Sequence, residues 1–345
     1  MRILLDVTHP ADVHFFARPL ANWRRDEHEV DVIARDKDVA HRLLEGLRIP
    51  FVPVGRAGSG FLGLARELVV RQARLLSIMK ARRPDVVVSF GGTFVVHPAR
   101  RLGIRSVVFT DTENARVSNA ITLRFASLVC TPRSYPHRVR APQLRYLGYK
   151  ELSYLDPRYF KADPDALLAA GLSVGEPFVF MRIVAWHSGH DFFDHGLTDL
   201  RATVRRLQAH ARVVLSSEGP LPADLEGLRF RGPLEQVHHV LAQARLYLGE
   251  SPTMAAEAAM LGTPALVVST SRRCYIDELA ERYGLVSHFD HPKHGQAQAL
   301  DHAEALLTRS DTAVLAQERL ARMLAEQEDV VEFVTDVVTG RRSAA

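Results

Sequence analysis

The stretch Ala244–Val268, ARLYLGESPTMAAEAAMLGTPALVV, contains a strand, a helix and a second strand in close succession. The apolar run Leu246–Gly249 predicts the first strand, and a helix is expected to begin near Met254. A glycine and a proline then end the helix, and Ala265–Ser269 predicts the next strand. This order is the βαβ unit of a parallel sheet.

The same alternation of short β-branched runs and helix-length segments extends in both directions. Further strands are expected at Arg2–Val7, Glu29–Ala34, Phe51–Val54, Asp85–Phe90, Arg105–Thr110, Leu128–Thr131, Phe178–Val184, Arg212–Ser216 and Leu228–Phe230. The rhythm pauses at Tyr146–Pro157, which predicts two doubly wound α/β domains, residues 1–152 and 153–345. Ligands of such sheets bind beyond the carboxyl ends of the strands, so the expected site is a cleft between two facing domains. The tail Asp311–Thr339 is expected to be mostly helical and to pack back across the domain junction.

Composition narrows the class of protein. The chain has 345 residues, 47% of them hydrophobic, with no apolar run long enough to span a bilayer and no secretion signal, so we expect a cytoplasmic protein. Its two cysteines form no disulfide or zinc motif. The net charge of +4 comes from basic residues mixed with acidic ones, which favours an anionic small molecule over a nucleic acid as partner.

One segment, Gly55–Pro84, predicts a long basic helix. After a glycine-rich entry, the helix would carry the cations Arg66, Arg71, Arg74, Lys80, Arg82 and Arg83. The first interpretation is a helix that packs on the core and exposes a solvated basic side. Peripheral contact with an anionic membrane surface is the alternative.

The turn before the helix near Met254 is the main candidate site. Ser251 and Thr253 lie where backbone N–H groups and the positive end of a helix dipole can bind phosphate. Glu257, one turn into the helix, has the carboxylate needed to accept hydrogen bonds from two ribose hydroxyls. The alternative is an ordinary capped helix with Glu257 on the surface.

Polar residues also follow the first strand, in VTHPADVH. His9 and Asp12 lie at the expected rim of the cleft, where a general base for catalysis would stand. Asp12 has a second interpretation, as the N-cap of a helix beginning at Val13. His14, inside that helix, is interpreted as structural.

Two more loops carry candidate ligand contacts. Arg182 lies near the end of the first strand of the second domain, and His187 and His190 follow that strand. All three are interpreted as phosphate contacts. Zinc or manganese at this histidine-rich loop is a weaker alternative, because the spacing fits no zinc motif, so no metal or other cofactor is expected. In SFGGTF, Gly91, Gly92 and Thr93 predict either close approach of backbone to a ligand or an ordinary βα turn.

Residues Arg231–Val268 resemble the nucleotide-binding segment of GT-B fold enzymes, the glycosyltransferases and non-hydrolysing UDP-N-acetylglucosamine 2-epimerases. MRILLDVTHPADVHFF, SFGGTF and VAWHSGHD resemble the uncharacterised DUF354 family, which is grouped with them. The resemblance covers nearly the whole chain and implies a GT-B fold, with two Rossmann-like domains. It also implies that Ser251 and Thr253 hold the pyrophosphate of a nucleotide sugar and that Glu257 holds its ribose.

The epimerase motifs are matched only in part. Asp111-Thr112-Glu113-Asn114-Ala115 matches His-Val-Glu-Ala-Gly and keeps the acid Glu113. Gly91-Gly92-Thr93 replaces Gly-Asp-Thr, Val117-Ser118-Asn119-Ala120 replaces Glu-x-Asn-Arg, and an acid is lost in each. Epimerisation needs acid and base groups that a sugar transfer does not need. The leading hypothesis is therefore a metal-independent glycosyltransferase that uses a nucleotide diphosphate sugar, with a UDP-sugar as the preferred donor.

In this hypothesis Ser251–Glu257 bind the donor, and His9, Asp12 and Glu113 face an acceptor that is not identified. Alternatives are an epimerase or hydrolase acting on the same donor and, from another class, a non-catalytic nucleotide-sugar sensor or assembly subunit. The sugar and the oligomeric state are left open.

Overall fold

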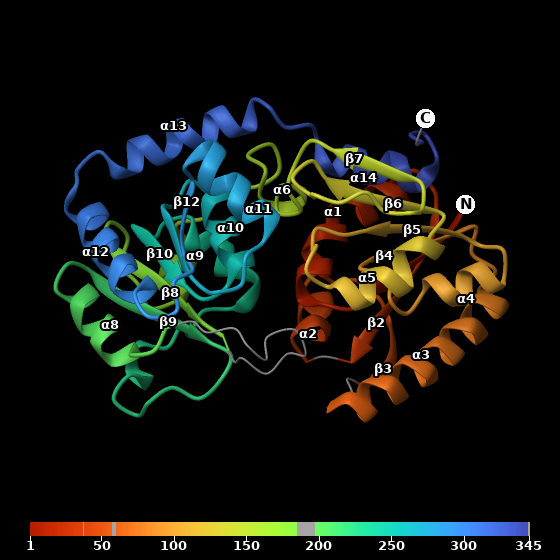
Figure 1. Cartoon of the computed structure of the whole chain (residues 1–345), viewed down its shortest axis with the longest axis horizontal. Coiled ribbons are helices and arrows are strands. Elements are labelled where there is room, and N and C mark those ends of the chain that lie inside the picture. The colour runs from red at the N-terminus through yellow and green to blue at the C-terminus, as the bar shows by residue number, and fades with distance from the viewer. Residues whose placement is uncertain (37, 57–59, 185–196, 344–345) are drawn as a thin grey trace. The chain divides into compact units, whose positions relative to one another are not determined.

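The computed structural model describes residues 1–36, 38–56, 60–184 and 197–343. The chain divides into two compact units (Figure 1). Unit 1 is Met1–Tyr154 together with Glu328–Ala345, and unit 2 is Leu155–Gln327. Each unit is built around one parallel sheet with helices against it, as expected for a doubly wound α/β fold.

Unit 1 holds a seven-stranded sheet in the order β3-β2-β1-β4-β5-β6-β7. Its strands are β1 Arg2–Val7, β2 Glu29–Asp36, β3 Val52–Arg56, β4 Val86–Phe90, β5 Arg105–Phe109, β6 Leu128–Pro132 and β7 Gln143–Tyr146, all paired in parallel. Its helices are α1 Pro10–Arg25, α2 Asp38–Gly46, α3 Gly60–Arg82, α4 Val96–Arg101, α5 Arg116–Thr122 and α14 Val330–Thr339, with the 3₁₀ turn η1 Leu123–Phe125. The helix α6, Leu152–Leu155, contains the boundary between the units.

Unit 2 holds a five-stranded sheet in the order β12-β11-β10-β8-β9. Its strands are β8 Phe178–Ile183, β9 Arg212–Ser217, β10 Leu246–Gly249, β11 Ala265–Val268 and β12 Val286–Phe289. Its α-helices are α7 Asp165–Ala169, α8 Leu200–Gln208, α9 Val237–Leu241, α10 Pro252–Met260, α11 Cys274–Glu278, α12 Gly295–Thr308 and α13 Thr312–Leu324. Short turns of 3₁₀ or π helix cover Glu226–Leu228, Leu234–Gln236 and Leu279–Tyr283.

The strand order of each unit reverses once. In unit 1 the chain runs outward from β1 to β3 and then returns to place β4 on the other side of β1. In unit 2 it runs from β8 to β9 and returns to place β10 on the other side of β8. Ligands of open α/β sheets bind at such reversal points, beyond the carboxyl ends of the strands.

The predicted strand Leu228–Phe230 is wrong. Only Arg229 bridges to Leu215, and the preceding Glu226–Leu228 is a 3₁₀ turn. Phe230 instead packs its ring 5.6 Å from that of Phe180, and its apolarity produced the strand signal. Conversely, the outer strands β7 and β12 were missed, because edge strands half open to solvent carry polar residues rather than an apolar run.

The predicted basic helix is α3, but Arg71 does not belong to its solvated side. The Arg71 side chain is fully buried and pairs with Asp6 of β1 at 2.5 Å. Arg74 and Lys80 are exposed, while Leu75 and Met79 pack into the core. No described helix is long and apolar enough to span a bilayer.

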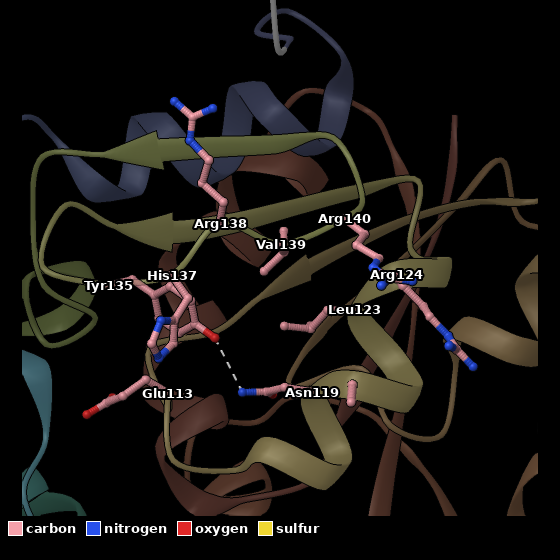
Figure 2. Close-up of a pocket in the computed structure, with 10 residues that line it drawn as sticks. Glu113, Asn119, Leu123, Arg124, Tyr135, His137, Arg138, Val139 and Arg140 are labelled. Carbon is pink, nitrogen blue, oxygen red and sulfur yellow. Dashed lines mark hydrogen bonds between the residues drawn. The ribbon is translucent and has the colours of Figure 1, made fainter.

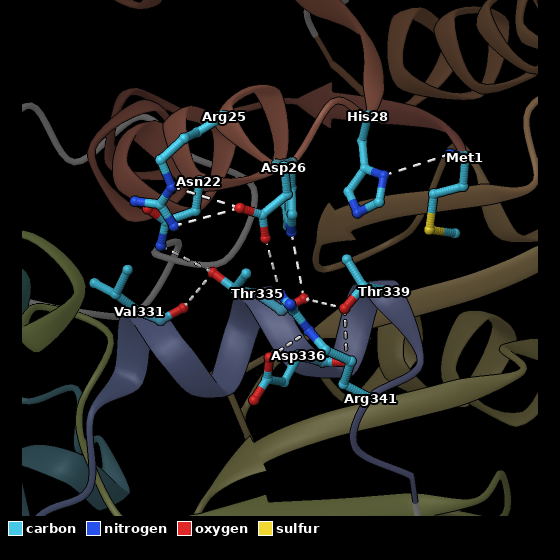
Figure 3. Close-up of polar contacts among 11 residues, drawn as sticks. Met1, Asn22, Arg25, Asp26, His28, Val331, Thr335, Asp336, Thr339 and Arg341 are labelled. Atoms are coloured by element: carbon cyan, nitrogen blue, oxygen red, sulfur yellow. Dashed lines mark hydrogen bonds and ion pairs between the residues drawn. The ribbon is translucent and has the colours of Figure 1, made fainter.

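The last helix, α14, is part of unit 1 and packs on α1 (Figure 1). Trp23 of α1 donates its indole N–H to the Thr335 carbonyl at 3.4 Å, and Asn22 contacts the Thr335 hydroxyl (Figure 3). Arg105 donates to the carbonyls of Val337 and Val338 at 2.8 and 2.9 Å, which satisfies the C-terminal end of the helix.

The packing of α14 within unit 1 leaves no space for a side chain at Gly148. A Cβ at Gly148 would lie 2.6 Å from a methyl carbon of Val330, and Val330 is buried. We expect Gly148→Ala to destabilise unit 1 by about 1–2 kcal/mol, because α14 must shift to accommodate the methyl group. Denaturant titration measures the loss in the free energy of unfolding. Gly46→Ala is the matched control, since nothing lies within 4 Å of its Cβ, and equal effects of the two changes would contradict the expectation.

Candidate functional site

At the reversal point of unit 1, the loop after β1 is built as a helix cap. The N-cap of α1 is His9, whose Nδ1 accepts from the Ala11 amide at 3.3 Å. Asp12 is the third helical residue, and its Oδ2 accepts from the amides of Thr8 and His9 at 2.9 and 2.8 Å and from the Thr8 hydroxyl. The interpretation of Asp12 as an N-cap is therefore wrong: the helix begins at Pro10, and Asp12 completes a capping box with His9.

Asp12 is buried, whereas His9 is exposed. Burial raises the pKa of Asp12 to about 6, although its hydrogen bonds to Thr8 and His9 and the charge of Lys150 act in the opposite direction. A carboxyl group with such a pKa holds or releases a proton near neutral pH, as a general base must. His14 lies 5.3 Å from the Tyr154 ring and packs against it.

The raised pKa of Asp12 makes stability depend on pH. Between the ordinary value near 3.8 and about 6, the native state binds the Asp12 proton more tightly than the unfolded chain does. Its contribution to the free energy of unfolding is therefore complete below pH 3.8 and is lost as the pH rises through 6. Asp12→Asn should remove this slope. Unfolding titrations of both proteins at pH 4, 5, 6 and 7 measure this dependence. If the free energy of unfolding changed with pH in the same way in both proteins, the raised pKa of Asp12 would be contradicted.

The glycines after β4 differ in their surroundings. Both have positive φ, 79° for Gly91 and 71° for Gly92. A Cβ at Gly92 would lie 2.7 Å from Val108, so packing on the sheet explains that glycine without a ligand. Gly91 has nothing within 4 Å of its Cβ position, and Thr93 hydrogen-bonds the Ser118 hydroxyl at 2.8 Å.

Sequence reasoning missed a buried cation at the same edge of the sheet. Lys150, which follows β7, places Nζ 3.3 Å from Asp111 and 3.8 Å from Glu151, and 5.2 Å from the centre of the Phe90 ring. Its side chain is only 8% exposed. Because Asp111 and Phe90 are at the ends of other strands, no local pattern could have indicated this cluster.

Glu113 lies in the loop between β5 and α5, where it lines a cavity of about 480 Å³ together with Asn119 and Tyr135 (Figure 2). Asn119 donates to the Thr112 carbonyl at 2.8 Å and to the Tyr135 hydroxyl at 3.3 Å. The acid retained from the epimerase motif is thus beside a cavity within unit 1.

In unit 2 the turn after β10 has the expected form. Ser251 is the N-cap of α10, and its hydroxyl accepts from the Met254 amide at 3.2 Å. Pro252, at the first helical position, has no N–H. The amides of Ser251 and Thr253 donate to no other described residue, so these two are the donors that the helix end presents.

Glu257 is buried rather than on the surface, which makes the surface interpretation wrong. Its Oε1 lies 3.1 Å from Nε2 of His238, in α9, and the two side chains are 8% and 7% exposed. A carboxylate held in this way has a fixed direction, as a ribose contact requires. His238 was missed, because its partner is nineteen positions away on another helix.

Of the three other residues predicted to contact phosphate, the structure describes only Arg182. Arg182, in β8, donates to the Ser216 hydroxyl and to Glu218, each at 2.7 Å. Buried Glu250, which sequence reasoning missed, accepts from the amides of Val184 and Leu197. His187 and His190 lie outside the described residues. Within the described parts of the chain, no group of three His, Cys, Asp or Glu side chains could hold a metal ion.

Residues 1–185 match the family described as "Protein of unknown function (DUF354)". The chain belongs to the DUF354 family. No curated protein matches this DUF354 chain in sequence.

Solved structures similar to the DUF354 chain share its fold over nearly its whole length. A putative UDP-N-acetylglucosamine 2-epimerase from Listeria monocytogenes aligns with a TM-score of 0.66 at 12% identity, covering 99% of this chain and 96% of its own. MnaA of S. aureus with UDP gives 0.67 at 11%, with the same coverages. The spinosyn rhamnosyltransferase SpnG with spinosyn aglycone gives 0.61 at 15%, covering 99% and 100%. The DUF354 chain therefore has the two-domain GT-B fold.

Proposed function

We propose that this protein is a metal-independent glycosyltransferase that takes its sugar from a UDP-sugar. The observation that carries the proposal is the arrangement after β10: two amides at the mouth of α10 that donate to no described residue, and a buried carboxylate one turn further on. It lies at the reversal point of the unit 2 sheet. Diphosphate binds to such helix mouths, and Glu257 would accept hydrogen bonds from the ribose.

The proposed chemistry is a displacement at the anomeric carbon. A general base removes the proton of the acceptor hydroxyl, whose oxygen forms a bond to that carbon while the bond to the UDP oxygen breaks. Asp12, with its pKa near 6, is our first candidate for the base, and His9 and Glu113 are the others. The helix mouth would stabilise the charge that develops on UDP without a metal ion.

The similar solved structures support this class of donor. One is a rhamnosyltransferase with thymidine diphosphate, and another has UDP bound. Because one of them is a putative UDP-N-acetylglucosamine 2-epimerase, the test must also distinguish epimerisation from transfer.

Incubating the full chain with a panel of UDP-sugars tests the proposal. We expect UDP release that depends on an added acceptor and persists in EDTA. Release with water alone would identify a hydrolase, and a product altered at C2 of the sugar would identify an epimerase. Tight binding without UDP release would identify a sensor. Each of these three results would contradict a transferase.

A further inference from the structure

The cavity in unit 1 is lined by apolar and basic residues. It lies between the α5–η1 segment and the segment that joins β6 to β7 (Figure 2). Leu123 and Val139 lie between its two sides, with Glu113 and His137 on one side and Arg140 on the other (Figure 2). Its volume of about 480 Å³ is that of a small-molecule site.

The joining segment is held in place from β7. Gln143 accepts from the Val139 amide at 3.2 Å and donates to the Thr131 hydroxyl at 2.9 Å. Arg145 donates to the His137 carbonyl at 3.2 Å. Because these bonds order the backbone, the cavity is formed before any ligand arrives, and little ordering cost remains for binding.

The charge around the cavity is strongly one-sided. Residues 114–150 contain six arginines, one lysine and no acid, a formal charge of +7 in a chain whose net charge is +4. Arg124, Arg138 and Arg140 line the cavity, and among the described residues none of the three pairs with a carboxylate. Arg124 lies over the Phe125 ring at 4.5 Å, and Arg138 is exposed and turned outward from the centre (Figure 2).

We propose that this cavity binds an organic phosphate, with the carbon skeleton against Leu123 and Val139 and the phosphate at Arg124 and Arg140. Guanidinium groups match phosphate geometry through paired N–H donors, and several of them together favour a dianion over a carboxylate. Glu113 lines the same cavity. If the proposed transferase function holds, the bound phosphate ester is the acceptor, and its hydroxyl is presented near Glu113.

Calorimetry with phenyl phosphate tests the site in the full chain, with UDP present in excess to occupy a donor site. We expect phenyl phosphate to bind more tightly than either phenol or inorganic phosphate, because the site uses both parts of the molecule. The double variant Arg124→Gln/Arg140→Gln should weaken binding about tenfold. The control Arg48→Gln/Arg101→Gln removes the same charge from exposed positions elsewhere in unit 1 and should leave the affinity unchanged.

Unchanged affinity in the first double variant, or an equal loss in the control, would overturn the proposal. Failure of the proposed function has a different signature: UDP would not bind, while the affinity for phenyl phosphate would still fall in Arg124→Gln/Arg140→Gln. Vesicles containing phosphatidic acid identify the source of the phosphate. Sedimentation with vesicles that the double variant abolishes assigns a lipid headgroup, and no sedimentation assigns a soluble ester; both results support the site.

Discussion

Arg71→Met is expected to destabilise unit 1 by about 3–5 kcal/mol, because it leaves the carboxylate of Asp6 buried without its cation. Arg71 Nη2 lies 2.5 Å from Asp6, the two side chains are 0% and 1% exposed, and the guanidinium lies 4.4 Å from the centre of the Phe94 ring. Burial raises the pKa of Asp6 even in the intact pair, against the opposing charge of Arg71. Urea titration at pH 7 measures the loss.

The same variant should become sensitive to pH. Without Arg71 the pKa of Asp6 rises further, so the native state holds the Asp6 proton in a range where the unfolded chain has lost it. The stability of Arg71→Met should therefore fall as the pH rises above 4. Asp6→Leu/Arg71→Met is the matched control, since replacing both partners by apolar groups leaves no buried charge and should recover most of the stability. If Arg71→Met were as stable as the wild-type protein, the Asp6–Arg71 pair would contribute nothing to the free energy of unfolding.

Glu257→Ala is expected to weaken UDP binding by about 3 kcal/mol, or roughly 100-fold, because two ribose hydroxyls lose a charged acceptor. Calorimetry with UDP measures this directly. His238→Ala should cost less, since Glu257 remains but loses the contact at 3.1 Å that holds its direction.

Glu318→Ala controls for the change of charge, because this glutamate is exposed on α13 of the same unit. Combining Glu257→Ala with His238→Ala should weaken binding no more than Glu257→Ala alone, since His238 acts through the carboxylate. Additive losses would mean that His238 contacts the nucleotide itself. Unchanged affinity in Glu257→Ala would remove Glu257 from the donor site.

Patterns among neighbouring residues predicted most of the strands and the loops that follow them. The strands β1 and β10 are buried apolar runs followed directly by cap residues, so the turn at Ser251 and the loop at His9 could be located from neighbouring residues. The capping box misled the interpretation of Asp12, since His9 is not among the common N-cap residues.

The contacts that give the candidate sites their character join distant positions. Asp6 meets Arg71, Asp111 meets Lys150 and His238 meets Glu257, in each case from different elements of the fold. Neither helical nor strand periodicity carries information about such pairs, because it reports only which face of an element is buried. Burial of a charged residue can be seen only once the sheet is assembled.

A crystal structure of the full chain with UDP tests the central claim most directly. We predict diphosphate oxygens within hydrogen-bonding distance of the Ser251 and Thr253 amides, and both ribose hydroxyls on the Glu257 carboxylate. UDP bound away from α10, or a helix mouth filled by the protein's own side chains while UDP binds elsewhere, would contradict the account.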